Sequence, residues 1–164
     1  MKMTARVYRG VAAGAVLLVG TLAYSQGTRA GSDPPTHVIV RADAVNFQPI
    51  EIPGFDSGVK IAAIYGNPNA EAGEYVIRLA FPDGYRFPAH WHPNAENLTV
   101  LQGEFMLGMG DTADASKLVT YAPGTFMYVP GKMPHFGAVK GATVVQLHGQ
   151  APFKIELAKP SASR

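Results

Sequence analysis

The chain has 164 residues, of which 47% are apolar, 16% are charged and 10% are aromatic, and its formal net charge is +2. Its length suits one globular domain, and the 31 Gly and Pro residues with few charges disfavour disorder, coiled coils and long amphipathic helices, so we predict an all-β protein. The absence of Cys excludes disulfides, thiolate metal sites and cysteine nucleophiles.

The first 25 residues have the pattern of a secretory signal peptide. Lys2, Arg6 and Arg9 precede an apolar run over residues 10–23, and a small-x-small cleavage pattern follows at residues 23–25. The alternative is a retained membrane anchor, but the run is shorter than the roughly 20 apolar residues that a spanning helix needs. We therefore expect a periplasmic or secreted protein, with cleavage after this pattern and no stable membrane insertion afterwards.

Removal of the signal peptide changes the charge balance of the chain. Without its three cations, 11 Lys and Arg remain against 12 Asp and Glu, a net charge of −1. Because no basic patch remains, nucleic acid is not an expected partner. Residues 26–36 are small, polar and Pro-containing, which predicts a flexible leader, and residues 37–160 form the predicted folded domain.

Short apolar or alternating stretches recur from residue 37 onward, separated by turn signals that contain Gly and Pro. We predict strands at residues 37–41, 59–65, 75–80, 98–102, 104–108, 117–121, 125–129, 143–148 and 153–157. The only helix-compatible stretch, residues 69–74, is too short to matter. So many short strands in one domain indicate a double-sheet jelly roll or a small barrel.

Three histidines and one glutamate form a candidate metal site. On a strand, His90 and His92 point to the same face with Cα atoms about 6.6 Å apart, so both imidazoles can bind one ion. A turn at residues 93–94 then brings Glu96 back as a third, anionic ligand. His135 follows a later turn that opens another strand, and it is the candidate fourth ligand.

The composition of this site indicates which metals suit it. Imidazoles with one carboxylate and no thiolate suit one divalent transition metal, namely Fe, Mn, Ni, Co, Cu or Zn, rather than Ca or Mg. Four protein ligands leave up to about two positions on an octahedral ion for water, dioxygen or substrate. The alternative is that one or more of these histidines are only hydrogen-bonded core residues of a scaffold without a metal.

The blocks that contain these residues resemble the two sequence motifs of the cupin family. The first motif, G-x5-H-x-H-x3-E-x6-G, is matched at every fixed position, by Gly84, His90, His92, Glu96 and Gly103. Five fixed positions at the right spacing make this a specific match.

The second motif, G-x5-P-x-G-x2-H-x3-N, is matched less completely. Gly124, Pro130 and His135 are present, but Lys132 stands where Gly is usual and Val139 replaces Asn. The candidate ligand is therefore kept, while the polar residue that follows it is lost.

The resemblance covers about residues 70 to 150 and implies a conical jelly-roll barrel, the double-stranded β-helix, with one divalent metal near its mouth. It also implies a homodimer. The family includes dioxygenases, oxalate-degrading enzymes, lyases and isomerases, so the resemblance implies the site and not the reaction. We expect an exported metalloenzyme that acts on a small organic molecule, either an oxidoreductase similar to dioxygenases or a lyase or isomerase. The alternative is a non-catalytic module that binds a small ligand.

Three further residues are candidates for catalytic roles. Counting alternation back from His90 puts Arg86 on the ligand face, where its guanidinium would pair with a substrate carboxylate; a surface position is the alternative. On the strand over residues 143–148, Gln146 and His148 alternate with a more apolar set of residues. They therefore either orient the metal-bound imidazoles or face solvent.

The departure at position 139 bears on the substrate. Val139 shares strand alternation with His135, which predicts that its side chain points into the same cavity. Replacing an amide by an isopropyl group removes polar sites and adds apolar wall, which Phe126 and Tyr128 would extend if their strand faces inward. We therefore predict a partly apolar molecule with a carbonyl or phenol group in preference to oxalate, with Arg86 as its anion partner.

Overall fold

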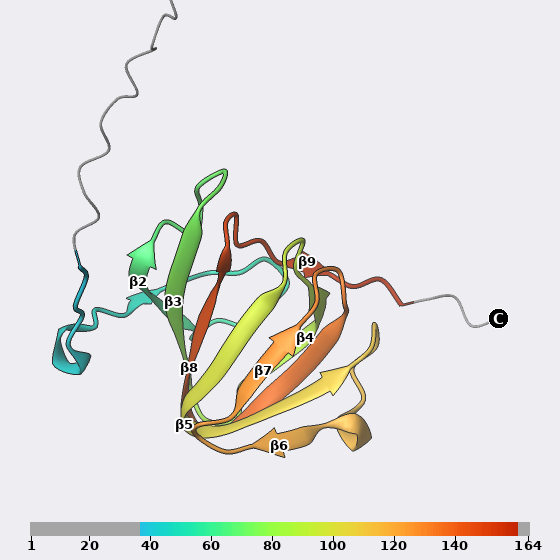
Figure 1. The fold of residues 1–164 in the computed structure, drawn as a ribbon. Helices are drawn as coiled ribbons and strands as arrows, with labels where there is room; N and C mark the ends of the chain where they lie inside the picture. Colours follow the sequence, from blue (N-terminus) through green and yellow to red (C-terminus); the bar gives the residue numbers. More distant parts are fainter. Residues whose placement is uncertain (1–36, 161–164) are drawn as a thin grey trace, which may run out of the picture. The chain divides into compact units, whose positions relative to one another are not determined.

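The computed structural model describes residues 37–160. Nine strands in this range form one curled sheet, and two short 3-10 helices lie in the connections (Figure 1). The elements in chain order are η1 (Ala42–Ala44), β1 (Gln48–Pro49), β2 (Lys60–Gly66), β3 (Glu74–Phe81), β4 (Arg86–Trp91), β5 (Glu96–Met109), η2 (Ala115–Lys117), β6 (Val119–Tyr121), β7 (Phe126–Val129), β8 (His135–Gln150) and β9 (Glu156–Leu157). The predicted signal peptide and leader, residues 1–36, lie outside the described residues. No helix within residues 37–160 is long and apolar enough to cross a membrane.

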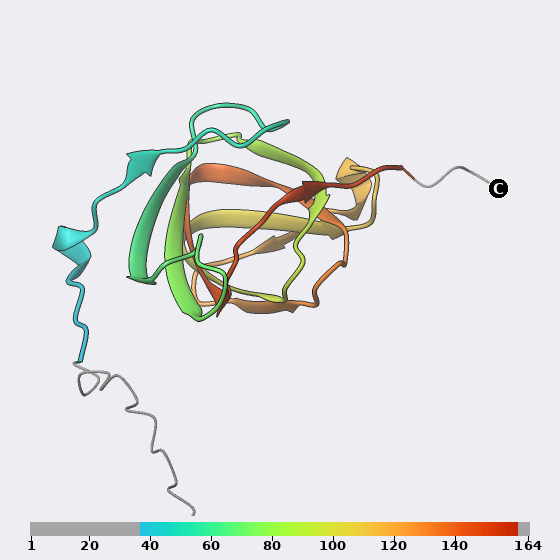
Figure 2. The ribbon, with the colours of Figure 1, turned by 90° about the horizontal axis from the view of Figure 1, so that it is seen from above.

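Two long strands build the barrel by running through both of its layers. The C-terminal half of β8 lies between β3 and the start of β5, and β7 pairs with that part of β5. The N-terminal half of β8 lies between β4 and the end of β5, which pairs with β6. All pairings are antiparallel, and the view from above shows the two layers facing each other (Figure 2). This arrangement confirms the predicted all-β jelly-roll barrel.

The bend between the layers depends on glycine. Gly103 and Gly141 have φ values of 77° and 73°, which L side chains rarely adopt, and a Cβ on Gly103 would collide with Thr143. The register of β5 against β8 shifts at this point. Gly103 therefore bends one continuous strand, where the sequence predicted two strands over residues 98–102 and 104–108.

The core lies between the two layers and follows strict alternation on β3 and on the C-terminal half of β8. Tyr75, Ile77, Leu79 and Phe81 of β3 are at most 9% exposed, and they face Thr143, Val145 and Leu147 of β8, which are at most 1% exposed. The inward set predicted for residues 143–148 is thus confirmed. Burying each large aliphatic side chain contributes about 1.5–3 kcal/mol, so this layer is a main source of stability.

The first predicted strand is wrong. Residues 37–41 form no strand, and Val38 and Ile39 are 56% and 79% exposed. These apolar residues have a high propensity for strands, but within the described residues no neighbouring strand pairs with them. The remaining predicted strands exist with shifted ends, two of them joined in β5, and residues 69–73 form turns and bends that lead into β3 rather than a helix.

Candidate metal centre

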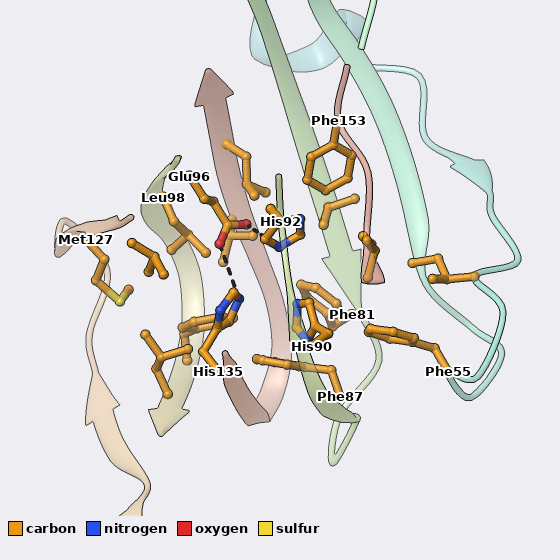
Figure 3. A pocket seen from close by; sticks show the side chains of 18 residues that line it. Phe55, Phe81, Phe87, His90, His92, Glu96, Leu98, Met127, His135 and Phe153 are labelled. Carbon is orange, nitrogen blue, oxygen red and sulfur yellow. Dashed lines mark ion pairs between the residues drawn. The ribbon is translucent and has the colours of Figure 1, made fainter. Parts of the chain in front are cut away.

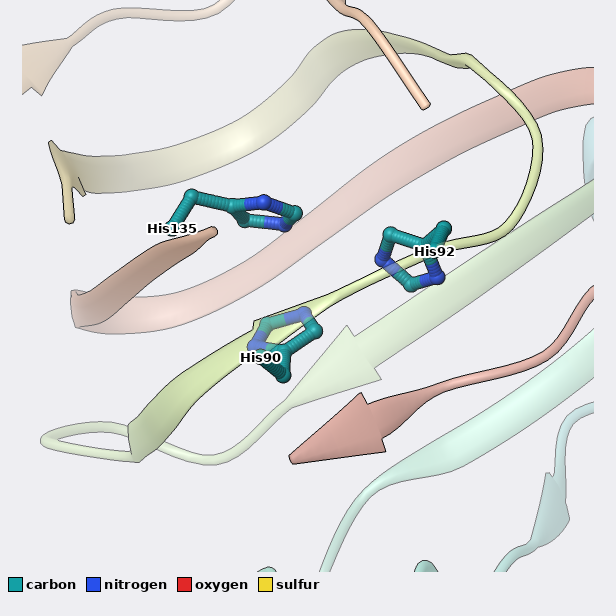
Figure 4. Close-up of side chains that lie close together, drawn as sticks. All are labelled: His90, His92 and His135. Carbon is teal, nitrogen blue, oxygen red and sulfur yellow. The ribbon is translucent and has the colours of Figure 1, made fainter. Parts of the chain in front are cut away.

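The four candidate ligands meet at one end of the barrel. His90 lies in β4, His92 directly after it, and Glu96 and His135 are the first residues of β5 and β8. All four are at most 6% exposed. The candidate ligand nitrogens of the three imidazoles lie within 4.8 Å of one another (Figure 4). The Glu96 oxygens lie 3.7 Å from His92 Nε2 and 3.5 Å from His135 Nε2 (Figure 3).

Backbone carbonyls orient all three imidazoles. The Nδ1 atoms of His90, His92 and His135 lie 2.7, 2.7 and 3.0 Å from the carbonyl oxygens of Pro88, Lys154 and Met133. Because a carbonyl only accepts hydrogen bonds, each Nδ1 is assigned as the N–H donor. Each neutral ring then carries its lone pair on Nε2, the nitrogen that is free to bind a metal.

The donor set fits a divalent transition metal. His92 Nε2 is fully buried and has no hydrogen-bond partner among residues 37–160, a costly situation that an ion would relieve. Three imidazoles and one carboxylate are also the ligand types that such metals prefer. Which of these residues bind an ion stays a prediction, but the structure brings together all four that the sequence singled out.

Burial controls the charge of the metal-free centre. Desolvation, and then the neighbouring imidazoles, lower the pKa of His90 to about 3, and desolvation lowers that of His92 to about 4. The pKa of His135 is lowered for the same reason. Burial raises the pKa of Glu96 to about 7. At neutral pH the metal-free imidazoles are therefore uncharged, and Glu96 is the group that exchanges a proton.

The cavity beside these four residues is apolar. Every other described side chain that lines it is apolar, including Phe87, which meets the His90 ring edge-on (Figure 3) and stacks on Phe105. Its free volume is about 40 Å³, and one water needs roughly 10–15 Å³. The cavity therefore admits only a few water-sized groups unless its walls move.

Arg86 does not reach this cavity, so its predicted role toward a substrate at the metal is wrong. It is exposed and lines a separate pocket on the outer surface with Asp56 and Asp114. The reason is a bulge in β4, where Phe87 pairs with Gly137 but His90 pairs with His135, so one extra residue lies between them. Alternation cannot be counted through such a bulge.

Gln146 and His148 also face away from the metal centre. Gln146 Oε1 accepts a hydrogen bond from Arg78 Nε at 3.1 Å, and the exposed His148 stacks against Phe126 with ring centroids 6.4 Å apart. Of the two alternatives for this pair, the structure therefore supports the outward one. Neither residue orients a metal ligand.

The predicted cavity wall is only partly correct. Val139 points inward as alternation predicted and is 2% exposed, but it packs in the core below the cavity and does not line it. Phe126 and Tyr128 are 57% and 60% exposed, because the inward residues of β7 are Met127 and Val129. The apolar wall exists, but other residues form it.

Two aromatic residues at the ligands were missed from the sequence. Phe55, from the segment between β1 and β2, contacts the His90 ring at 5.2 Å between centroids. Phe153, from the segment between β8 and β9, stacks on the His92 ring at 5.1 Å. Neither lies in a block that contains a ligand, and only the tertiary fold brings them to the site.

Comparisons with known proteins agree with this fold and site. Residues 78–148 match the family model of the cupin domain. No match is found among curated proteins. Among solved structures, the chain is similar to the polyketide cyclase RemF from Streptomyces resistomycificus, with a TM-score of 0.62 and 18% identity over 77% of this chain and 88% of that one.

Two further solved structures show the same fold. A candidate acetylacetone dioxygenase from Methylibium petroleiphilum PM1 has a TM-score of 0.57 and 18% identity over 80% of this chain and 90% of that one. A cupin-2 domain protein from Rhodospirillum rubrum has a TM-score of 0.56 and 17% identity over 77% and 84%. At these identities the likeness extends to the fold alone.

Proposed function

Because this chain belongs to the cupin family and gathers three imidazoles and a carboxylate at one point of its barrel, we propose that it is an exported metalloenzyme. It would bind one divalent transition metal and convert a small, largely apolar organic molecule that carries a carbonyl or phenol oxygen. The carrying observation is the set of three Nε2 lone pairs, each fixed by a carbonyl on Nδ1, that converge beside Glu96.

The proposed ligands are His90, His92, Glu96 and His135. A bound metal would supply Lewis-acid polarisation of a substrate oxygen and, if it is iron or manganese, redox chemistry with dioxygen. The protein's own contribution is to hold the imidazoles neutral and oriented, to keep water out with the apolar wall, and to supply the Glu96 carboxylate as the one anionic ligand.

The cavity lining supports the substrate class. Apart from the four proposed ligands, the described lining offers no hydrogen-bonding side chain, so a small dianion such as oxalate would regain its lost hydration energy from the metal alone. A small molecule that binds through one oxygen is favoured instead, and its apolar body would be buried in the cavity as the walls move to admit it. The names of two structural neighbours, a cyclase and a dioxygenase, are consistent with an organic substrate.

A metal and oxygen assay tests this proposal. The full-length chain is expressed with its leader, the exported fraction is purified, its N-terminal mass is measured and its metal content is determined. Iron-loaded and manganese-loaded samples are then incubated with catechol, acetylacetone and oxalate while oxygen uptake is followed. We expect about one metal ion per chain, loss of residues 1–25, and turnover of an organic probe in preference to oxalate.

Each part of the proposal can fail separately. A native chain that keeps residues 1–25 in the membrane would contradict export. Absence of stoichiometric metal would contradict the metal centre. Faster turnover of oxalate would contradict the substrate class. Full metal occupancy by zinc, with no turnover in the oxygen assay or in product analysis, would favour the non-catalytic ligand-binding module.

A further inference from the structure

One of the three imidazoles is oriented by a distant part of the chain. Residues 151–157, here called the closing segment, follow β8 in the chain and pass beside His92 (Figure 3). The segment ends with β9, which pairs with β4. The Lys154 carbonyl accepts the His92 Nδ1–H at 2.7 Å, although the two residues are 62 positions apart. Phe153 lies on the same imidazole, with an interplanar angle of 19°.

The other two imidazoles are oriented locally. His90 and His135 each donate to a carbonyl only two residues earlier in the chain, that of Pro88 or Met133. These hydrogen bonds persist as long as the strand ends are formed. The hydrogen bond of His92, in contrast, exists only while the closing segment is docked.

Several contacts dock the closing segment on the barrel end. Asn94, in the turn between His92 and Glu96, donates through Nδ2 to the carbonyls of Gln150 at 3.0 Å and Pro152 at 3.4 Å. The Phe153 amide donates to the Pro68 carbonyl at 2.7 Å. The same turn that separates two proposed ligands therefore also anchors the segment.

We propose that the closing segment is a positioning element of the metal centre. Its Lys154 carbonyl and Phe153 ring fix the tautomer and plane of His92, so segment docking and metal binding stabilise each other. Partners that orient a metal-bound imidazole typically change metal affinity 10–100-fold. Because such coupling is reciprocal, a bound metal must hold the segment against the barrel by the same factor. This inference rests on the metal centre proposed above.

Zinc affinity of the full-length protein tests the first direction of this coupling. Phe153→Ala removes the ring on His92, and Asn94→Ala loosens the anchor without touching a ligand. We expect each to weaken zinc binding, measured by competition with a chelator, at least 10-fold. Phe55→Ala is the matched control, because it removes an equally close ring from a ligand, His90, whose carbonyl partner is local. It should change zinc affinity less than threefold.

Amide hydrogen exchange followed by NMR tests the reverse direction on the unaltered protein. The amides of Ala151 and Phe153 in the closing segment, and of Ala158 directly after it, donate to carbonyls outside the segment. Zinc should slow their exchange at least 10-fold, while the Phe55 amide, which bonds within its own turn to Ile52, should change less than threefold.

The outcomes separate the two proposals. In one outcome, zinc binds the wild type at one ion per chain, the Asn94 and Phe153 variants keep the wild-type zinc affinity, and zinc does not slow amide exchange. The closing segment then has no positioning role and the metal centre stands. Equal losses in the Phe55 and Phe153 variants would likewise overturn the positioning role. If the wild type binds no divalent metal, both proposals fall.

Discussion

Glu96 is a buried carboxyl whose surroundings oppose its ionisation in the metal-free protein. It is 6% exposed, and its nearest polar neighbours are the uncharged imidazoles of His92 and His135. Burial raises its pKa from 4.5 to about 7. Glu96→Gln inserts a neutral side chain of the same shape that can still donate a hydrogen bond to an imidazole Nε2. We expect this variant to be more stable than the metal-free wild type above pH 7, although it loses a proposed ligand.

The size and sign of the effect follow from the two pKa values of Glu96. Because the pKa of Glu96 is higher in the folded than in the unfolded protein, its protonated carboxyl adds to the free energy of unfolding. This contribution is fully present below about pH 4.5 and is lost as the pH rises through about 7. At 1.36 kcal/mol per pKa unit, the free energy of unfolding of the wild type falls by about 3 kcal/mol by pH 8.5. That of the variant does not fall in this way, because its amide does not ionise. The three histidines have lowered pKa values and act in the opposite direction, losing stability as the pH falls below 6.5. They are common to both proteins, so they cancel in the difference.

The assay is urea denaturation of both proteins in excess chelator between pH 4.5 and 8.5, followed by fluorescence of the single tryptophan, Trp91. Glu104→Gln is the matched control. Its carboxylate is 47% exposed and pairs with Lys140 at 3.5 Å, so it should change stability by no more than about 1 kcal/mol. A Glu96→Gln variant that is less stable than the wild type at pH 8.5, or a difference that does not change with pH, would refute the reasoning. With saturating zinc the order should reverse, because the wild type alone keeps its anionic ligand.

Five further substitutions have defined outcomes. His92→Ala and His135→Ala should each abolish stoichiometric metal, and full occupancy by elemental analysis in both would show that the ligands are wrongly chosen. Arg86→Ala should leave metal content and turnover unchanged, because the side chain lies outside the cavity; a large loss of kcat/KM would contradict this. Lys132→Gly should raise the free energy of unfolding by about 1 kcal/mol, since Lys132 has a φ of 63° that costs an L residue roughly 1–2 kcal/mol. Val139→Asn should lower the free energy of unfolding by about 3 kcal/mol, because an amide in the core finds no partner there. Urea denaturation measures the stability of both variants. Oxalate turnover should not improve in Val139→Asn.

The features of this protein that could be predicted from its sequence depend on the spacing and alternation of residues close together in the chain. The two-residue spacing of His90 and His92 and the turn before Glu96 place three candidate ligands without any knowledge of the barrel. Alternation over residues 143–148 likewise identifies the buried face of β8. The closing segment could not be found in this way, because its contact with His92 spans 62 positions and involves a backbone carbonyl, which no side-chain pattern encodes.

The bulge in β4 explains both the one misplaced arginine and the orientation of a proposed ligand. Pro88 stands inside the strand, where it lacks the N–H that a regular ladder would use, and proline within sheets is confined to edges and bulges. The extra residue that it introduces turns Phe87 and His90 inward together and leaves Arg86 outside. The Pro88 carbonyl then accepts the His90 Nδ1–H at 2.7 Å. The same proline that makes alternation unreliable in this strand therefore also directs the His90 lone pair toward the centre of the site.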